Sequence, residues 1–493
     1  MSGYLKRLAS SLGAYQIADL IAKLLAVLLL PLYTRYVTPA GYGIVETLAT
    51  FVIFVSILVR LGMIESFLRF YFADEDQARR DALARRAAGF LLLTTTLASV
   101  AMGIPAGPLA RLVTTANNPW DFRVAVIGVW AFTNLEMAYA LLRVDERLRA
   151  YVTASVTNVA LTITASVILV VGFHLGARGL LIANYGATVV VLLGLWWALR
   201  QRLLPHRARS QPLGVLLHFG LPTVPAEASV YALSVLDRQY VVHARDLAAA
   251  GFYSLALKLA GAVAFIVRAF QYAWPPLAYS VRDDGEAGRL YGLVSTYYVL
   301  ISGWAVVGLG LEARWILRLL AAPRFFESYR AVPWVSLGWA MYGLWVVLLV
   351  IAGRAQVTRR NFPAALTGLV VNVVMLIVLV PRYGIAGAGV ALCGAYLAML
   401  AVMYLLVRQA FPVQFEWRRL AHIVLVMGVF TVVGDLALPA SGAVGFLTRA
   451  AAFLLVPPAL FVTGFAHPQE LHQVRVLLDR ARGRRLADDG GVA

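Results

Sequence analysis

The chain has 493 residues, of which 61% are hydrophobic and only 14% are charged. Soluble domains carry about 25% charged residues, so this composition excludes a string of soluble domains and predicts a polytopic membrane protein. The single cysteine, Cys393, excludes a disulfide framework and a cysteine-based metal site.

Long apolar segments follow one another from end to end, each able to cross a hydrocarbon core of about 30 Å. The first follows a short basic leader, Lys6 and Arg7, and is too long for the apolar part of a signal peptide, so we predict a retained first helix. We expect an all-α protein with fourteen transmembrane helices near residues 11–33, 43–66, 87–109, 122–142, 152–173, 178–199, 214–236, 248–272, 290–311, 331–352, 362–380, 385–407, 420–438 and 443–465.

The formal charge of +18 reflects membrane topology rather than nucleic-acid binding. With the N-terminus inside, most arginines and lysines outside the spans fall in segments that face the cytoplasm, beside an anionic leaflet. This pattern predicts a multi-pass protein of the cytoplasmic membrane with both termini cytoplasmic, including a tail at 467–493.

An internal repeat links the two halves of the chain. At an offset of 208 residues, Gly43 falls on Gly251 and Arg60 falls on Arg268, and the flanking segments share the same layout of helix, outer turn and helix. We therefore predict two parallel six-helix lobes, followed by two further helices, with the bounds 1–205, 206–410 and 411–466. Transporters built from such repeats bind substrate between the lobes.

Four cations lie within predicted spans, where a charge costs about 3 kcal/mol on insertion scales. They are Lys23, Arg60, Lys258 and Arg268. Their repeat-related positions favour a water-filled cavity for an anion, and the planar guanidinium group suits a diphosphate. Two alternatives remain open: Arg60 and Arg268 extend to the inner interface, or Asp19 and Lys23 form a structural pair.

The seventh span, FGLPTVPAEASV, carries Pro222 and Pro225, which predict a broken or kinked helix. Broken helices occur where carriers bend, although a static kink remains an alternative. We expect no cofactor and no metal centre. Proton or sodium coupling, or gating, is predicted at the acidic residues Asp19, Glu46, Glu227 and Asp237.

Several segments resemble the polysaccharide-synthesis flippases, the Wzx-like branch of the multidrug/oligosaccharidyl-lipid/polysaccharide (MOP) exporter superfamily. They are PLYTRYVTPAGYG (31–43), LGMIESFLRFYF (61–72), FGLPTVPAEASVYALSVLDRQYV (219–241) and GFYSLALKLAGAVAFIVRAFQYAWPPLAYS (251–280). The resemblance implies a MATE-like fold of fourteen helices. It also implies flipping of an undecaprenyl-diphosphate-linked oligosaccharide for polysaccharide or O-antigen export, with membrane lipids and a glycan polymerase or export machinery as partners.

Two other functions are compatible with the hydropathy pattern. A multidrug exporter of the same superfamily would carry cationic substrates and would favour carboxylates over four cations. A membrane glycan ligase or polymerase would need a large outer loop with acid and base residues, and the longest predicted outer loop, at 312–330, is short. The sequence therefore predicts a transporter and not an enzyme, with no nucleic-acid partner.

Overall fold

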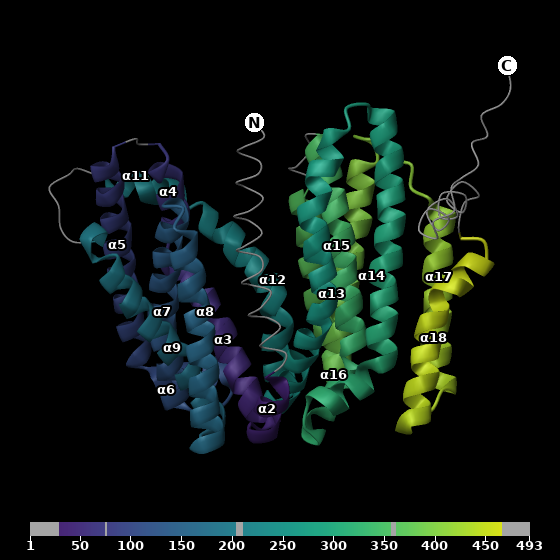
Figure 1. Ribbon diagram of the computed structural model, residues 1–493, viewed down its shortest axis with the longest axis horizontal. Helices are drawn as coiled ribbons and strands as arrows, with labels where there is room; N and C mark the ends of the chain where they lie inside the picture. The colour runs from purple at the N-terminus through teal and green to yellow at the C-terminus, as the bar shows by residue number, and fades with distance from the viewer. Residues whose placement is uncertain (1–28, 74–75, 204–210, 356–360, 466–493) are drawn as a thin grey trace, which may run out of the picture. The chain divides into compact units, whose positions relative to one another are not determined.

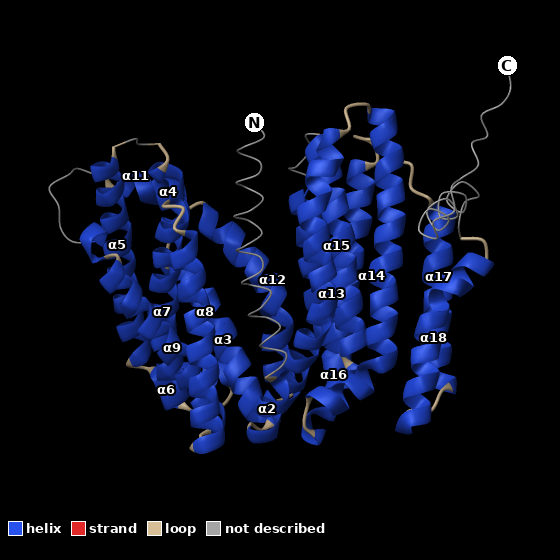
Figure 2. Ribbon diagram, in the orientation of Figure 1, coloured by secondary structure: helices blue, strands red, loops and turns tan. Residues whose placement is uncertain are grey.

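The computed structural model describes residues 29–73, 76–203, 211–355 and 361–465, and every regular element within these ranges is helical (Figures 1 and 2). The predicted all-α class is confirmed. The elements, in chain order, are α2 (Leu30–Tyr36), α3 (Pro39–Val59), α4 (Met63–Tyr71), α5 (Gln77–Gly103), α6 (Ala106–Thr114), α7 (Pro119–Val144), α8 (Leu148–Ser166), the π-helix η1 (Val167–Gly172), α9 (Gly176–Ala198), α10 (Arg200–Leu203), α11 (Leu213–Gly220), α12 (Thr223–Ala244), α13 (Leu247–Ser280), α14 (Asp284–Leu320), the 3₁₀-helix η2 (Pro323–Arg330), α15 (Val332–Arg354), α16 (Asn361–Val407), α17 (Trp417–Ala437) and α18 (Gly442–Val462).

Within the described ranges, 11 helices are long and apolar enough to cross a membrane. One of them, α16, covers two predicted spans. Its 47 residues are interrupted at Gly384, whose φ of 58° and ψ of −135° are not helical. At 1.5 Å per residue α16 would extend for about 70 Å, more than twice the hydrocarbon core, so two crossings fit this element better than one. The total of fourteen spans stays a prediction.

The predicted break in the seventh span is confirmed. Helix α11 ends at Gly220 and α12 begins at Thr223, with Pro222 between them. Proline has no N–H to continue the hydrogen-bond ladder of α11. Pro225 causes no second break because it lies in the first turn of α12, where backbone N–H groups have no intrahelical acceptor.

The chain forms two compact units. Unit 1 comprises Met1–Leu259, Leu317–Ala331 and Asn372–Ala391, and unit 2 comprises Ala260–Ile316, Val332–Val371 and Leu392–Ala493. Helices α13, α14 and α16 contribute residues to both. The predicted lobes, 1–205 and 206–410, rest on the sequence repeat and remain predictions.

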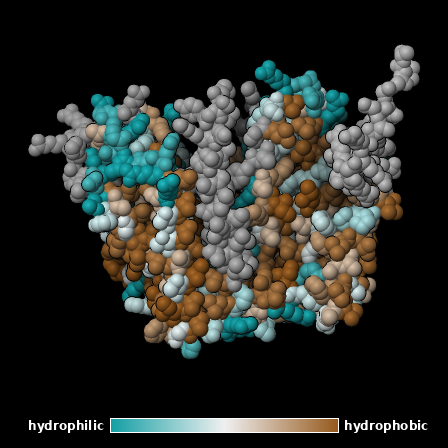
Figure 3. All heavy atoms as spheres, in the orientation of Figure 1, coloured by the Kyte–Doolittle hydropathy of each residue, from teal (hydrophilic) through white to brown (hydrophobic). Residues whose placement is uncertain are grey.

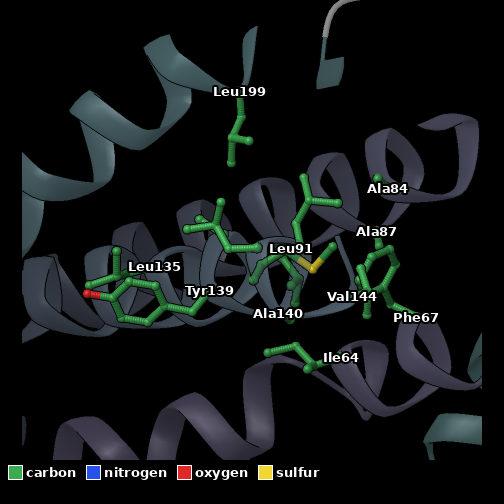
Figure 4. Close-up of a cluster of buried hydrophobic side chains, with 14 of the residues drawn as sticks. Ile64, Phe67, Ala84, Ala87, Leu91, Leu135, Tyr139, Ala140, Val144 and Leu199 are labelled. Carbon is green, nitrogen blue, oxygen red and sulfur yellow. The ribbon is translucent and has the colours of Figure 1, made fainter. Parts of the chain in front are cut away.

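Helix α7 is the most buried candidate span of unit 1. Small residues such as Ala131 and Ala140 are fully buried and allow neighbouring helices to approach closely. Three polar residues on α7 are also buried, and each has a partner. Thr133 donates to the Val129 carbonyl, Asn134 donates to Thr95, and Asp121 accepts from Arg178. Figure 4 shows the apolar cluster in which Leu135 and Tyr139 of α7 lie among Phe67 of α4, Leu91 of α5 and Leu199, the residue after α9.

The outward surface of unit 1 separates into an apolar band and a hydrophilic end. Leu93 and Leu97 on α5 are more than half exposed, as expected for side chains that face lipid. Hydrophilic residues gather at the end where α4, α5 and α11 lie (Figure 3). That end carries the basic segment 79–86, which the sequence assigns to the cytoplasm.

An ion-pair network ties the hydrophilic end of unit 1 together through Arg202. Its guanidinium group lies 2.8 Å from an Asp81 carboxylate oxygen and also pairs with Asp145, whose side chain is 6% exposed. Tyr71 donates a further hydrogen bond of 2.7 Å to Asp145. The network joins α4, α5 and the residues after α7 to α10.

Replacing Arg202 with methionine should lower the midpoint of thermal unfolding, because Asp145 would remain nearly buried without this cation. We expect a loss of about 1–3 kcal/mol, the usual cost of an unsatisfied buried polar group. Thermal unfolding in detergent micelles measures the change. Arg200→Met is the matched control, since Arg200 is exposed and its guanidinium group contacts the carbonyl and the ring of Trp197, one turn before it. Equal midpoints for the two variants would contradict the prediction.

Unit 2 has its own apolar clusters. One joins Val307 and Leu311 on α14 to Ile423 on α17 and Val456 on α18. Trp304 stacks on Phe453 there, with ring centroids 4.8 Å apart. At another point, Arg354 closes the end of α13 by donating hydrogen bonds to the carbonyls of Val281 and Arg282. Unit 2 therefore has a packed interior independent of the one around α7.

Candidate functional site

The candidate site of unit 1 is organised by α3, which carries one charged residue near each end. Thr38 caps the start of α3 by accepting a hydrogen bond of 3.1 Å from the Gly41 N–H, and Glu46 follows two turns later. The other end stops at Val59, because Leu61 and Gly62 adopt positive φ angles of 49° and 67°. Arg60 therefore caps the helix, whereas the sequence predicts it inside a span that runs to residue 66.

Glu46 lies between two cations. Its Oε1 is 2.6 Å from Lys258 Nζ on α13, and its Oε2 is 3.6 Å from Arg238 Nη1 on α12. Arg238 also donates to Thr50 Oγ1 at 2.6 Å, one turn along α3. The Lys258 ammonium group lies 5.0 Å from the centre of the Tyr42 ring, a cation–π contact. This Glu46 cluster has one more cation than carboxylates.

Arg60 has the opposite surroundings. Its Nη2 pairs with Glu227 on α12 and lies 3.5 Å from Glu65 on α4. The Arg60 side chain is 11% exposed, so this charge is largely shielded from solvent. A cavity of about 340 Å³ adjoins the pair, lined by Ile53, Ser56, Ile57, Arg60, Phe132, Glu136, Glu227 and Tyr231. In this Arg60 cluster the carboxylates outnumber the cation.

A third buried polar group lies between α12, α13 and α16. The Tyr253 hydroxyl donates a hydrogen bond of 3.0 Å to Asp237 Oδ2. The other carboxylate oxygen of Asp237 and both amide atoms of Asn372 are buried, and the Asn372 amide lies near the Asp237 carboxylate. Asp237 is 3% exposed and Asn372 is fully buried. The described ranges hold no group of three or more His, Cys, Asp or Glu residues that could bind a metal ion.

The structure brings four of the predicted site residues together in two pairs, Glu46 with Lys258 and Arg60 with Glu227. Lys23 and Asp19 lie outside the described residues. Arg268 is exposed on the part of α13 that belongs to unit 2. The predicted anion site requires more cations than carboxylates. Within unit 1 that excess holds around Glu46 and is wrong around Arg60, because Glu65, Glu136 and Glu227 fold to the same place.

Three contributors were missed. Arg238 completes the Glu46 cluster, Glu65 contacts Arg60, and Asn372 lies near Asp237. Arg238 directly follows the predicted site residue Asp237, on a helix that begins at a proline break. This position beside a predicted site residue could have identified Arg238 from the sequence. Asn372 lies in a uniformly apolar segment, and a lone amide in such a segment suggests a buried polar contact but not its partner.

A family model described as "Polysaccharide biosynthesis protein" matches residues 8–278, more than half of the chain, including both ion-pair clusters. No curated protein sequence matches the chain significantly.

Solved structures with a similar fold are membrane transporters. The lipid II flippase MurJ in an inward closed conformation has a TM-score of 0.69 at 13% identity, covering 90% of this chain and 96% of MurJ. An inward-facing multidrug resistance MATE transporter of the MOP superfamily has a TM-score of 0.62 at 16% identity, covering 80% and 93%. A mutant of the Vibrio cholerae MATE transporter VcmN has a TM-score of 0.52 at 14% identity, covering 82% and 94%. At these identities the likeness shows the fold, which is the predicted MATE-like one.

Proposed function

Because this chain belongs to the polysaccharide biosynthesis protein family, we propose that it flips a lipid-diphosphate-linked oligosaccharide across the cytoplasmic membrane by alternating access. The expected lipid is undecaprenyl diphosphate, and the glycan then enters polysaccharide or O-antigen assembly. The observation that carries the proposal is the family match, since it spans the charged helices of unit 1. The fold shared with a lipid II flippase supports it.

The Glu46 cluster supplies a chemical route for the diphosphate. Lys258 and Arg238 hold one carboxylate between them, at 2.6 and 3.6 Å. A diphosphate carries more negative charge than a single carboxylate and accepts several charge-assisted hydrogen bonds, so it competes with Glu46 for both cations. We expect Glu46 to release them most readily when it is protonated. Binding of the substrate would then be linked to uptake of a proton.

The coupling ion is part of the same proposal. Proton or sodium coupling at Glu46, Glu227 or Asp237 would give transport its direction. Asp237 is the one with a buried environment of neutral oxygen-bearing groups, Tyr253 and Asn372, which suits either a proton or a hard cation that prefers oxygen ligands. We place both termini in the cytoplasm, as the basic segments favour, and a glycan polymerase or export machinery beside the exit.

A transport assay tests the proposal. The purified full chain would be placed in liposomes with a labelled undecaprenyl-diphosphate oligosaccharide, and a glycosidase outside would report the glycan that reaches the outer leaflet. Lys258→Gln and Arg268→Gln should each slow flipping by about tenfold or more, since a charge-assisted hydrogen bond contributes roughly 1.5–3 kcal/mol. Arg111→Gln is the control, because Arg111 is exposed on α6. Wild-type flipping rates in both test variants, at equal protein content, would remove the claim.

A further inference from the structure

The two ends of α3 are held by direct backbone contacts to helices that follow residue 212. At one end, a Cβ added at Gly43 would overlap the carbonyl of Leu247, and one added at Gly251 would overlap the carbonyl of Pro39. At the other end, a Cβ added at Gly220 would overlap the carbonyl of Gly62. Each contact therefore exists because no side chain separates the two backbones.

The two contacts lie at opposite ends of α3. From Gly43 to Val59 the helix rises about 24 Å at 1.5 Å per residue, most of the ~30 Å of a hydrocarbon core. Figure 1 shows α3 running from α2 at one end to α4 at the other, alongside α12. The Gly62–Gly220 contact is at the hydrophilic end with the basic segment 79–86, and the Gly43–Gly251 contact is at the opposite end.

An ion pair lies just inside each contact. Glu46, three residues after Gly43, pairs with Lys258 at 2.6 Å, and Arg60, two residues before Gly62, pairs with Glu227. Both pairs connect α3 or its cap to α12 and α13. The 340 Å³ cavity lined by Ile53, Ser56 and Tyr231 lies along the stretch of α3 between the two contacts.

We propose that these two contacts are the gates of the transport pathway. The Gly43–Gly251 contact with the Glu46–Lys258 pair closes the extracytoplasmic end, the Gly62–Gly220 contact with the Arg60–Glu227 pair closes the cytoplasmic end, and one gate opens at a time. The inference deepens the proposed function and rests on it for the direction of transport. In the described structure of unit 1 both gates are closed.

A contact between two backbones can both seal the pathway and open again. Backbone against backbone excludes water and ions more completely than two side chains with a gap between them. Such a contact also separates without withdrawing interdigitated side chains from a core. The ion pairs add a closing force that is strong when the contact excludes water and weak when water enters, because Coulomb attraction falls as the local dielectric constant rises. Each gate therefore has two favourable arrangements, closed and dry or open and hydrated.

Thiol accessibility tests this inference. In a Cys393→Ala background, Ile53→Cys places one thiol on the cavity wall. A membrane-impermeant maleimide would be added to one side of the membrane at a time, in the full chain. Gly251→Ala should raise labelling from the extracytoplasmic side by about tenfold, and Gly220→Ala should raise it from the cytoplasmic side. Both should lose glycan transport, because a wedged gate cannot close.

Matched controls are available on the same helices. A Cβ at Gly261 on α13 or at Gly214 on α11 meets nothing within 4 Å, so Gly261→Ala and Gly214→Ala should label like the parent chain. Should Gly251→Ala or Gly220→Ala fail to fold, Lys258→Gln and Glu227→Gln weaken the same gates without adding atoms, and should expose the thiol to the same respective sides.

The possible results distinguish failure of the gate proposal from failure of the proposed function. Labelling that is unchanged in all four gate variants, or that rises equally from both sides, overturns the gates and leaves the proposed function standing if the wild-type chain still flips glycan. Side-specific labelling in a chain that moves no lipid-linked glycan supports the gates and overturns the proposed function. The extent of labelling does not depend on the substrate, because the maleimide reports only the accessibility of the thiol at residue 53.

Discussion

Replacing Glu46 with glutamine will destabilise unit 1 more than replacing its partner Lys258 with glutamine. The Glu46 carboxylate pairs with two cations, so Glu46→Gln leaves both Lys258 and Arg238 without a carboxylate partner at this site. The Arg238 side chain is only 15% exposed, so water compensates its charge poorly. We expect a loss of roughly 2 kcal/mol or more, since removing one partner leaves charges uncompensated in a poorly solvated place. Lys258→Gln preserves the contact between Glu46 and Arg238, and Lys258 is a third exposed, so its loss should be about 1 kcal/mol or less.

Thermal and denaturant unfolding in detergent micelles will measure these differences. The double variant Glu46→Gln, Lys258→Gln serves as the control. It should recover part of the stability lost in Glu46→Gln, because it removes one of the two stranded cations, and residues in direct contact couple by about 0.5–3 kcal/mol. A double variant whose losses simply add, or single variants of equal stability, would show that Glu46 does not balance both cations.

Replacing Arg449 with methionine will loosen the last helical hairpin, α17 and α18, from α14. The Arg449 side chain is 1% exposed, its Nη1 lies 3.4 Å from Asp435 Oδ1, and it donates to the carbonyls of Pro439 and Leu438 at 3.2 Å. Its guanidinium group also lies 5.5 Å from the centre of the Trp315 ring on α14. Methionine keeps much of the apolar volume and none of these donors.

We expect Arg449→Met to cost about 3 kcal/mol or more, the range for breaking a buried ionic and hydrogen-bonded group. Limited proteolysis should cut the turn at 438–441 faster, because Arg449 contacts the Asp435 carboxylate and the carbonyls of Asp435, Leu438 and Pro439 around this turn. Arg418→Met on α17 is the matched control, since Arg418 is exposed. Unchanged cleavage at this turn in Arg449→Met would contradict the expected role.

The pairing of α3 with α12 and α13 relates these results to transport. In the proposed mechanism, a substrate that binds Lys258 and Arg238 would displace Glu46 and loosen the ion pair at the extracytoplasmic gate. A diphosphate would then be recognised at this site and would also favour opening of that gate. We therefore expect Glu46→Gln both to lower the stability of unit 1 and to increase access to the cavity from the extracytoplasmic side.

The sequence by itself determined the class of the protein, since composition and apolar segments of membrane length leave no other physical solution than a helical bundle. It also predicted the break at Pro222, because proline cannot continue the hydrogen-bond ladder of the preceding helix. It did not show which prolines a helix accommodates, since Pro457 and Pro458 lie inside α18. The family resemblance in segments 31–43 and 219–241 likewise needed no structure, and the family match confirms it.

Only the tertiary structure decided which charge faces which. Glu46 and Lys258 are 212 residues apart, and Arg60 and Glu227 are 167 apart. Helical periodicity places a residue on a face of its own helix and says nothing of the helix opposite. The sequence therefore identified unusual charges in the membrane and overestimated their excess, because the compensating carboxylates, Glu65 and Glu227 above all, arrive from α4 and α12. The sequence could not predict the glycine contacts either. A glycine permits a close backbone approach, but the sequence does not show which backbone approaches it.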